Sequence, residues 1–264
     1  MRTETNVILR LRRVAGVIYP PIFFFLFLLI AWQLYVEYTH YPRFLLPTPY
    51  EIMSEFLISW PTLVPHFIAT LLEIVSGFFV GSIIGVILGI WVAYSKLAER
   101  VIYPLAILVK VAPVVAIAPM ITLWFGFGIL SKIVITSIIS FFPLVLNMSA
   151  GLTSIDPSLV DLMHSLSAKE TEIFLKIRLP NSVPYAFAGL KIAITVSVVG
   201  AIVAEFAGAL AGLGFMANMA MAYIETPLLF VLLMILSFLG IALFGMISML
   251  ERIFVPWAAA RGAR

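Results

Sequence analysis

The feature of this sequence that most limits how it can fold is a series of long apolar runs with few or no charged residues. Residues 14–36, for example, contain no Asp, Glu, Lys or Arg. A helix needs about 20 apolar residues to cross the hydrocarbon core of a bilayer. Only 11% of the 264 residues are charged, whereas soluble domains average about 25%. The sequence therefore predicts an all-α, polytopic membrane protein.

The apolar runs predict about six transmembrane helices within a single domain, residues 14–250. The predicted spans are residues 14–36, 67–94, 101–125, 133–149, 183–210 and 227–250. The first run is longer than the roughly 7–15 apolar residues of a cleaved signal peptide, which favours a retained span. Residues 1–13 and 251–264 are predicted to be polar tails.

The stretch between the first two spans, residues 37–65, is polar and contains five prolines. We expect it to lie outside the bilayer and to hold only short helical pieces. Within it, Thr48-Pro49-Tyr50-Glu51 predicts a helix start, because Thr48 can cap the helix and Pro49 suits its first position.

The second and third spans carry residues that bear on helix packing. In the second span, glycines recur at every fourth position, and such residues share one helix face. They are Gly77, Gly81, Gly85 and Gly89. A smooth face of this kind lets another helix approach closely, and it suits either ordinary packing within the chain or a role in moving parts. The third span contains Pro104, Pro113 and Pro119, which should kink it.

Positive charge is distributed unevenly between the two sides of the predicted domain. If the N-terminus is inside, one side receives the Lys and Arg residues of both tails and of the connectors after the second and fourth spans. These residues are Arg2, Arg10, Arg12, Arg13, Lys96, Arg100, Lys169, Lys176, Arg178, Lys191, Arg252, Arg261 and Arg264. The opposite loops keep only Arg43 and Lys132. Because cytoplasmic loops are enriched in Lys and Arg, both termini are predicted to be cytoplasmic.

The long hydrophilic interval between apolar spans, residues 153–178, falls on the same cytoplasmic side. Asp156-Pro157 predicts a helix start, and Ser167-Ala168 interrupts before a second short helix. Apolar residues recur at helical spacing in the first helix, at Leu159, Leu162, Met163 and Leu166. We expect this apolar side to pack down on the membrane domain and the tips to dock a partner. A plain linker that lies on the bilayer is the alternative.

Three polar residues inside spans are candidates for the transport pathway: Glu205, Lys110 and Asn147. A carboxylate within a membrane segment is costly and marks either a pathway or a pairing partner. For Glu205 both roles stay open, and Lys110 could pair or extend toward the interface. Asn147 suits contact between helices better than contact with substrate.

Several kinds of site are excluded or disfavoured by the sequence. There is no cysteine, so no disulfide or thiolate metal site can form. No phosphate-binding G-x-x-x-x-G-K-[ST] motif is present, so we expect no cofactor and no ATP on this chain. The three histidines lie far apart, which disfavours a metal site, and no catalytic dyad or G-x-S-x-G motif is found. The net charge of +3 is explained by membrane lipid and orientation, and not by nucleic acid.

The polar interval resembles the cytoplasmic loop of ABC-importer permease subunits. The resemblance is carried by Asp161-Leu162-Met163-His164-Ser165-Leu166-Ser167-Ala168, followed by Ile177-Arg178-Leu179-Pro180. Other segments resemble the branch of the family that imports sulfonates, taurine, nitrate and vitamin precursors. They are Leu45-Leu46-Pro47-Thr48-Pro49, residues 66–95, Trp124-Phe125-Gly126-Phe127-Gly128, Phe141-Phe142-Pro143, Ala204-Glu205 and Gly212-Leu213-Gly214. The resemblance extends over residues 45–257.

The loop departs from the family pattern at its bend. Ser167 stands where the family has a turn glycine, and Met163 and His164 replace small and basic residues. A non-glycine residue in a turn that needs positive φ costs about 1 kcal/mol. The loop is therefore expected to turn differently from that of the family.

The resemblance implies a transport subunit, not an enzyme, that works by alternating access. ATP and Mg²⁺ would bind to two cytosolic ABC ATPase subunits, each of which receives residues 161–168 in a surface groove. A second permease copy, in a homodimer or in a heterodimer with a homologue, would complete the pathway. An extracytoplasmic binding protein would deliver the substrate, and the implied location is the cytoplasmic membrane of a bacterium or archaeon.

The substrate branch is suggested by three further stretches, residues 199–205, 212–214 and 226–230. They resemble the branch importing thiamin-pyrimidine precursors or riboflavin more than the sulfonate branch, so we expect a vitamin-like heterocycle. The alternatives are an aliphatic sulfonate, taurine or nitrate, each of which should need positive charge in the pathway. From another class, an ATP-independent transporter or channel is the alternative.

Overall fold

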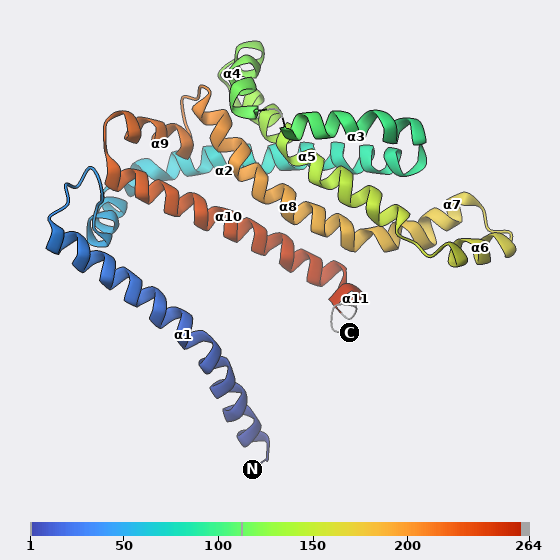
Figure 1. Ribbon diagram of the computed structural model, residues 1–264, viewed down its shortest axis with the longest axis horizontal. Helices are drawn as coiled ribbons and strands as arrows, with labels where there is room; N and C mark the ends of the chain where they lie inside the picture. The colour runs from blue at the N-terminus through green and yellow to red at the C-terminus, as the bar shows by residue number, and fades with distance from the viewer. Residues whose placement is uncertain (1, 112, 260–264) are drawn as a thin grey trace. The chain divides into compact units, whose positions relative to one another are not determined.

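The computed structural model describes residues 2–111 and 113–259, and this part of the chain is helical and contains no strand. The helices are α1 (Arg2–Thr39), α2 (Pro49–Tyr94), α3 (Lys96–Val111), α4 (Val114–Phe125), α5 (Ile129–Thr153), α6 (Pro157–Ser165), α7 (Glu170–Ile173), α8 (Leu179–Phe206), α9 (Leu213–Ala222), α10 (Thr226–Phe254) and α11 (Pro256–Ala259) (Figure 1). A short π-helix, Phe174–Arg178, joins α7 to α8. The all-α prediction is confirmed.

Within the described residues, five helical segments are long and apolar enough to cross a membrane. They are Tyr19–Thr39, Pro49–Tyr94, Ile129–Thr153, Glu170–Phe206 and Thr226–Phe254. The third predicted span, residues 101–125, was expected to be kinked by its prolines, and this segment is divided between the two shorter helices α3 and α4. Pro113 lies at the break with an extended backbone, and its missing N–H cannot donate to a helical hydrogen bond.

The connector between the first two spans is also shorter than expected. α2 begins at Pro49 and continues without interruption through Pro61 and Pro65, so the prediction of short helical pieces over residues 37–65 is wrong. Each proline removes only one backbone donor, and a membrane helix can absorb such a loss through local adjustment. The predicted start is confirmed: Glu51 N–H donates to Thr48 Oγ1 (3.2 Å), and Thr48 N–H donates to Glu51 Oε2 (3.0 Å).

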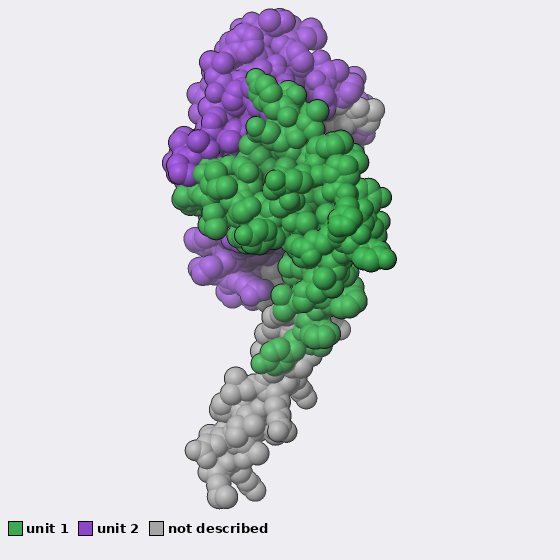
Figure 2. All heavy atoms as spheres, turned by 90° about the vertical axis from the view of Figure 1, so that its left-hand side faces the viewer, with its two compact units in different colours: residues 1–60, 220–231 green, residues 61–219, 232–264 purple. Residues whose placement is uncertain are grey.

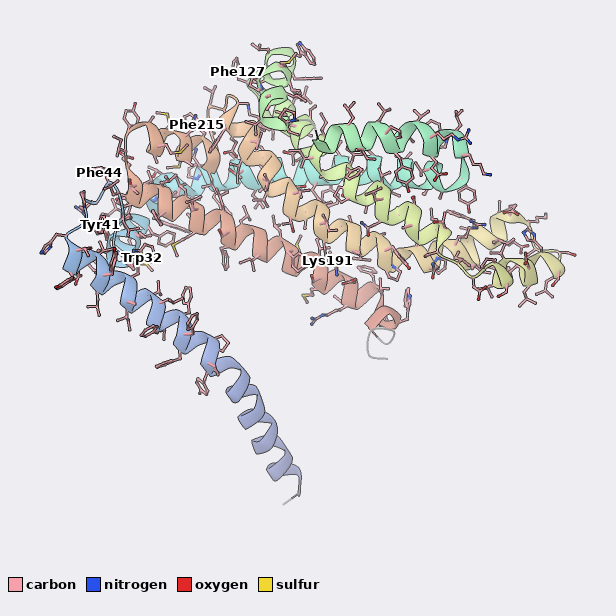
Figure 3. All side chains as sticks on the ribbon, viewed as in Figure 1. Trp32, Tyr41, Phe44, Phe127, Lys191 and Phe215 are labelled. Carbon is pink, nitrogen blue, oxygen red and sulfur yellow. The ribbon has the colours of Figure 1, made fainter. Side chains whose placement is uncertain are left out.

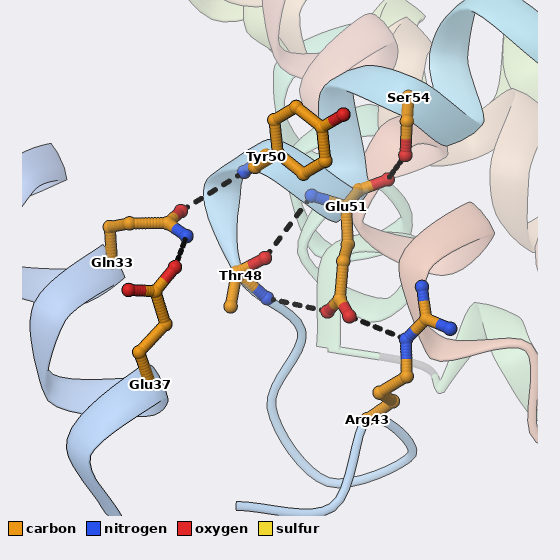
Figure 4. Close-up of polar contacts among 7 residues, drawn as sticks. All are labelled: Gln33, Glu37, Arg43, Thr48, Tyr50, Glu51 and Ser54. Atoms are coloured by element: carbon orange, nitrogen blue, oxygen red, sulfur yellow. Dashed lines mark hydrogen bonds and ion pairs between the residues drawn. The ribbon is translucent and has the colours of Figure 1, made fainter. Parts of the chain in front are cut away.

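The chain forms two compact units (Figure 2). Unit 1 comprises residues 1–60 and 220–231. In it the start of α2 is tied to α1, because the Tyr50 N–H donates to Gln33 Oε1 (3.2 Å) (Figure 4). Arg43, in the connector between the two helices, pairs with Glu51 (2.5 Å). Thr226 Oγ1 donates to the Phe44 carbonyl (2.7 Å), which fixes the start of α10.

Unit 2 comprises residues 61–219 and 232–264. Its centre is α5, which packs against α8 and against the glycine face of α2. Each of the four α2 glycines lies against α5, where an added Cβ atom would collide: at Gly85 it would lie 2.7 Å from the Phe141 carbonyl oxygen, and at Gly89 it would lie 2.8 Å from Met148 Cβ. The glycines therefore set the α2–α5 separation. The apolar core beside them joins α2, α8 and α10 through Ile74, Phe78, Ala193, Ile194, Val198, Ala201, Leu239, Leu243 and Ile247.

The tight α2–α5 contact can be tested by Gly81→Ala. An added Cβ atom at this position would meet Ser140 Oγ and lie 2.8 Å from the Ser137 carbonyl oxygen. Because overpacking of this kind costs about 1–3 kcal/mol, we expect a lower unfolding temperature for the purified protein in detergent.

Gly245→Ala is the matched control. Gly245 lies in α10 with no atom within 4 Å of an added Cβ, so the same substitution should leave the unfolding temperature unchanged or raise it slightly through better helix propensity. Equal effects of the two substitutions would contradict the proposed role of the glycine face.

Candidate functional site

The first candidate site is the loop formed by residues 153–178, in which the two predicted short helices are present. Asp156 caps α6 by accepting hydrogen bonds from the Ser158 hydroxyl (2.7 Å) and N–H (2.9 Å). The same two bonds hold the pKa of the Asp156 carboxyl below its ordinary value. At the second helix, Lys169 N–H donates to Glu172 Oε2 (3.0 Å). Both helices are therefore started by local side-chain caps.

The bend between these helices is at Ser167, whose φ is +60°. Ala168 N–H donates to the Met163 carbonyl (3.0 Å), and Ser167 N–H donates to the His164 carbonyl (2.9 Å). This pair of bonds defines a Schellman motif, in which the left-handed position is usually a glycine. The loop thus keeps a left-handed turn at the position where the family has glycine, and Ser167 bears the associated strain, so the expectation of a different turn is wrong.

The expected packing of α6 is wrong. Leu159, Leu162 and Leu166 are 44%, 54% and 69% exposed, whereas Val160 and Met163 are half-buried. The three leucines follow helical spacing and share one face, and that face is turned away from the membrane helices. The short helix that follows has a buried apolar anchor in Ile173.

The base of the loop is attached to the membrane helices through Arg178. Its guanidinium lies 5.4 Å from the centre of the Tyr94 ring at the end of α2, a cation–π contact. Arg178 also lines a cleft of about 230 Å³ together with Asp161, Thr153, Ile155, Pro157 and Val160. Of the other predicted coupling residues, His164 and Ser165 are exposed and Ala168 is half-buried.

The second candidate site surrounds Glu205, which is only 1% exposed near the end of α8. Its carboxylate accepts a hydrogen bond from Thr70 Oγ1 (2.6 Å) and two from the backbone, namely from Gly214 N–H (2.5 Å) and Phe215 N–H (3.0 Å). Thr70 itself accepts from Leu213 N–H (2.7 Å). The Glu205 carboxylate therefore binds the backbone at residues 214 and 215.

These bonds cap the N-terminal end of α9. The first N–H groups of a helix have no acceptor within the helix, and here four successive ones are satisfied by side chains from α2 and α8. The first of the four along the chain is Gly212 N–H, which donates to His66 Nδ1 (2.9 Å). His66 also stacks on the Phe215 ring, with centroids 6.0 Å apart. We call His66, Thr70 and Glu205 the α9 cap.

Lys132, in the first turn of α5, is buried beside this cap. The sequence counted it among the charges of the outer loops, and in the structure its side chain is only 1% exposed. Its ammonium donates to the carbonyls of Phe127 and Gly208, both at 2.7 Å. Phe127 belongs to the turn between α4 and α5, and Phe215 to the first turn of α9 (Figure 3). Lys132 thus joins the α4–α5 turn to the end of α8.

The remaining predicted pathway residues lie elsewhere. Asn147 is in α5, where its amide donates to the Pro143 carbonyl of its own helix (2.8 Å). Lys110 lies near the end of α3, and its side chain is outside the described part of the chain. The α9 cap includes His66 and Thr70, whose connection with Glu205 the sequence did not predict. Among described residues, no cluster of three His, Cys, Asp or Glu side chains could hold a metal ion.

Residues 81–255, more than half of the chain, match the model of the family described as "binding-protein-dependent transport system inner membrane component". The chain belongs to this family. It is the permease subunit of an ABC importer, a multi-pass inner-membrane transport component whose ATPase is a separate chain. Importers of this family also use a substrate-binding partner.

The permease is similar over most of its length to two curated proteins. It is 34% identical to the formylaminopyrimidine transport permease protein ThiX of Halalkalibacterium halodurans, covering 90% of this chain and 95% of the relative. It is 32% identical to the riboflavin transport system permease protein RibX of Chloroflexus aurantiacus, covering 88% of each. A solved structure of the MetNI methionine ABC transporter in an inward-facing conformation shares the fold, with a TM-score of 0.62, 19% identity, and 72% of this chain and 95% of that chain covered.

The strain at the loop bend predicts the effect of Ser167→Gly. Glycine adopts positive φ without the clash that a Cβ atom causes, so we expect the loop to be stabilised by about 1 kcal/mol. Hydrogen exchange of the amides of residues 163–168 should slow by several-fold. Ser165→Gly is the control, because Ser165 has helical geometry and glycine there should destabilise α6 by about 1 kcal/mol. Faster exchange in Ser167→Gly would contradict this account of the turn.

Proposed function

We propose that the permease imports a small, vitamin-like heterocycle of the thiamin-pyrimidine precursor or riboflavin class. The observation that carries this proposal is the 34% identity, over 90% of the chain, with a permease named for formylaminopyrimidine transport. The similarity to a riboflavin permease supports the same chemical class. Both named substrates are flat, nitrogen-containing heterocycles.

The charges of the described helices favour a heterocycle over the alternatives of an aliphatic sulfonate, taurine or nitrate. A route for such anions should carry an available cation. Lys132 is engaged by two backbone carbonyls, and Lys191 pairs with Glu251 (2.9 Å). Both lysines already have partners, which leaves neither as a ready ligand for an anion.

The exposed leucine face of α6 is the proposed docking surface for the ATPase. Leu159, Leu162 and Leu166 form an apolar strip on a loop whose base is fixed by Arg178 and Ile173. Such a strip, exposed at the tip of a polar loop, suits burial in a groove of a soluble partner. ATP and Mg²⁺ would bind to that partner, and each of two ATPase subunits would receive one loop.

The assembly around the permease is proposed to contain a second permease copy in a homodimer, with a heterodimer as the alternative, and an extracytoplasmic binding protein. We place both termini and the loop in the cytoplasm, because Lys and Arg gather on that side. An ATP-independent transporter or channel is the rival of another class. It would have no use for an apolar docking strip, and it would transport without an ATPase.

Docking through α6 is tested by Leu162→Asp. A charge on the exposed strip should be costly to bury in the partner, so we expect the ATPase to dissociate on co-purification and ATP-driven uptake to fall at least tenfold. Leu162→Met keeps the apolar volume and should retain both properties. Normal co-purification and uptake with Leu162→Asp would place the docking surface elsewhere.

The substrate class is tested by uptake into proteoliposomes that contain the permease, its ATPase and its binding protein. We expect ATP-dependent accumulation of formylaminopyrimidine or riboflavin, and none of taurine. Accumulation of taurine alone would overturn the substrate proposal while leaving the docking proposal intact. Uptake by the permease without any ATPase would instead establish the rival class.

A further inference from the structure

We infer that His66 is a positioning residue: its neutral imidazole holds the start of α9, and protonation of the imidazole releases that end of the helix. His66 Nδ1 lies 2.9 Å from the Gly212 backbone nitrogen. A backbone N–H can only donate, so Nδ1 must be the acceptor and must carry no proton. Protonation of the ring would place two donors against each other and abolish the bond.

The position of the imidazole at a helix end strengthens this effect. The N-terminal end of α9 carries partial positive charge, which favours the Glu205 carboxylate and disfavours an imidazolium. His66 is half-buried and stacked on Phe215 in the first turn of α9. The ring therefore touches α9 through both a hydrogen bond and a ring face, and loss of the bond should loosen this turn.

Other ionisable groups border the cap and must be distinguished from His66. They are Glu205 on α8, Glu73 on α2 and Lys132 on α5, whereas α9 itself contains no ionisable side chain. One oxygen of Glu73, Oε2, is buried without a hydrogen-bond partner. The imidazole is the group whose ordinary pKa, about 6.5, lies between pH 5 and 8. Asparagine offers an acceptor oxygen at a similar place to Nδ1 without titrating, so His66→Asn separates the imidazole from the carboxyls.

The experiment uses cysteine labelling of the full-length permease in nanodiscs, which is possible because the chain has no native cysteine. Ala217 lies in α9 and is 3% exposed, so Ala217→Cys should react with a soluble maleimide only when α9 loosens. Leu210→Cys is the exposed reference (82%), and the ratio of the two rates removes the pH dependence of the thiol itself.

We expect the ratio of labelling rates to rise about tenfold between about pH 8 and about pH 5.5 with His66 present, as loss of one hydrogen bond from a buried group predicts. With His66→Asn the ratio should stay low at both pH values, and with His66→Ala it should be high at both. A ratio that does not change with pH when His66 is present would overturn the inference. An equal rise in His66→Asn would also overturn it, because the response would then belong to a carboxyl. A low ratio at about pH 8 in His66→Ala would overturn it as well. If His66→Ala does not fold, the comparison of His66 with His66→Asn decides alone.

Discussion

A bilayer interior offers no water to the backbone, so every amide and carbonyl there must be satisfied by protein. The permease meets this requirement at its non-helical connectors with two buried charges. Glu205 accepts from the amides that begin α9, and Lys132 donates to the carbonyls of Phe127 and Gly208. Helix ends carry partial charges of the opposite sign to these groups. Each of these two groups therefore interacts with backbone dipoles at helix ends.

This use of side chains as caps explains two glycines around α9. Gly208 and Gly212 both have positive φ, at 139° and 122°. A Cβ atom at Gly212 would overlap the Glu205 carboxylate, and one at Gly208 would lie 2.9 Å from the Phe127 ring. The cap can approach the backbone only because these positions lack side chains. Because the backbone amides of α9 need acceptors, this contact requires an acceptor side chain at Glu205 and a residue without a side chain at Gly212.

Local features of the structure could be predicted from the sequence, whereas the α9 cap could not. The start of α6 follows from Asp156-Pro157, and the bend at Ser167 from the family pattern, because caps and turns depend on neighbouring residues. The bonds from Thr70 to Glu205 and from Gly212 to His66 join residues 135 and 146 positions apart. A repeating pattern in a single sequence cannot show that residues so far apart in the chain are in contact. The burial of Lys132 was not predicted for a similar reason, since counting charges assumes that each lysine in a connector faces water.

Parts of both candidate sites lie on one continuous helical segment, Glu170–Phe206. Its first turns form the second half of the docking loop, and Glu205 is at its other end. With a rise of about 1.5 Å per residue, 37 residues give a rod of about 55 Å. The π-helical turn at Phe174–Arg178 lies where the loop joins this rod, and π-helical turns in helices are frequent at functional sites. The second half of the loop and Glu205 therefore belong to the same helical segment. Because α5 packs along α8 and its Lys132 binds the Gly208 carbonyl, α5 is joined to this segment both along its length and at its end.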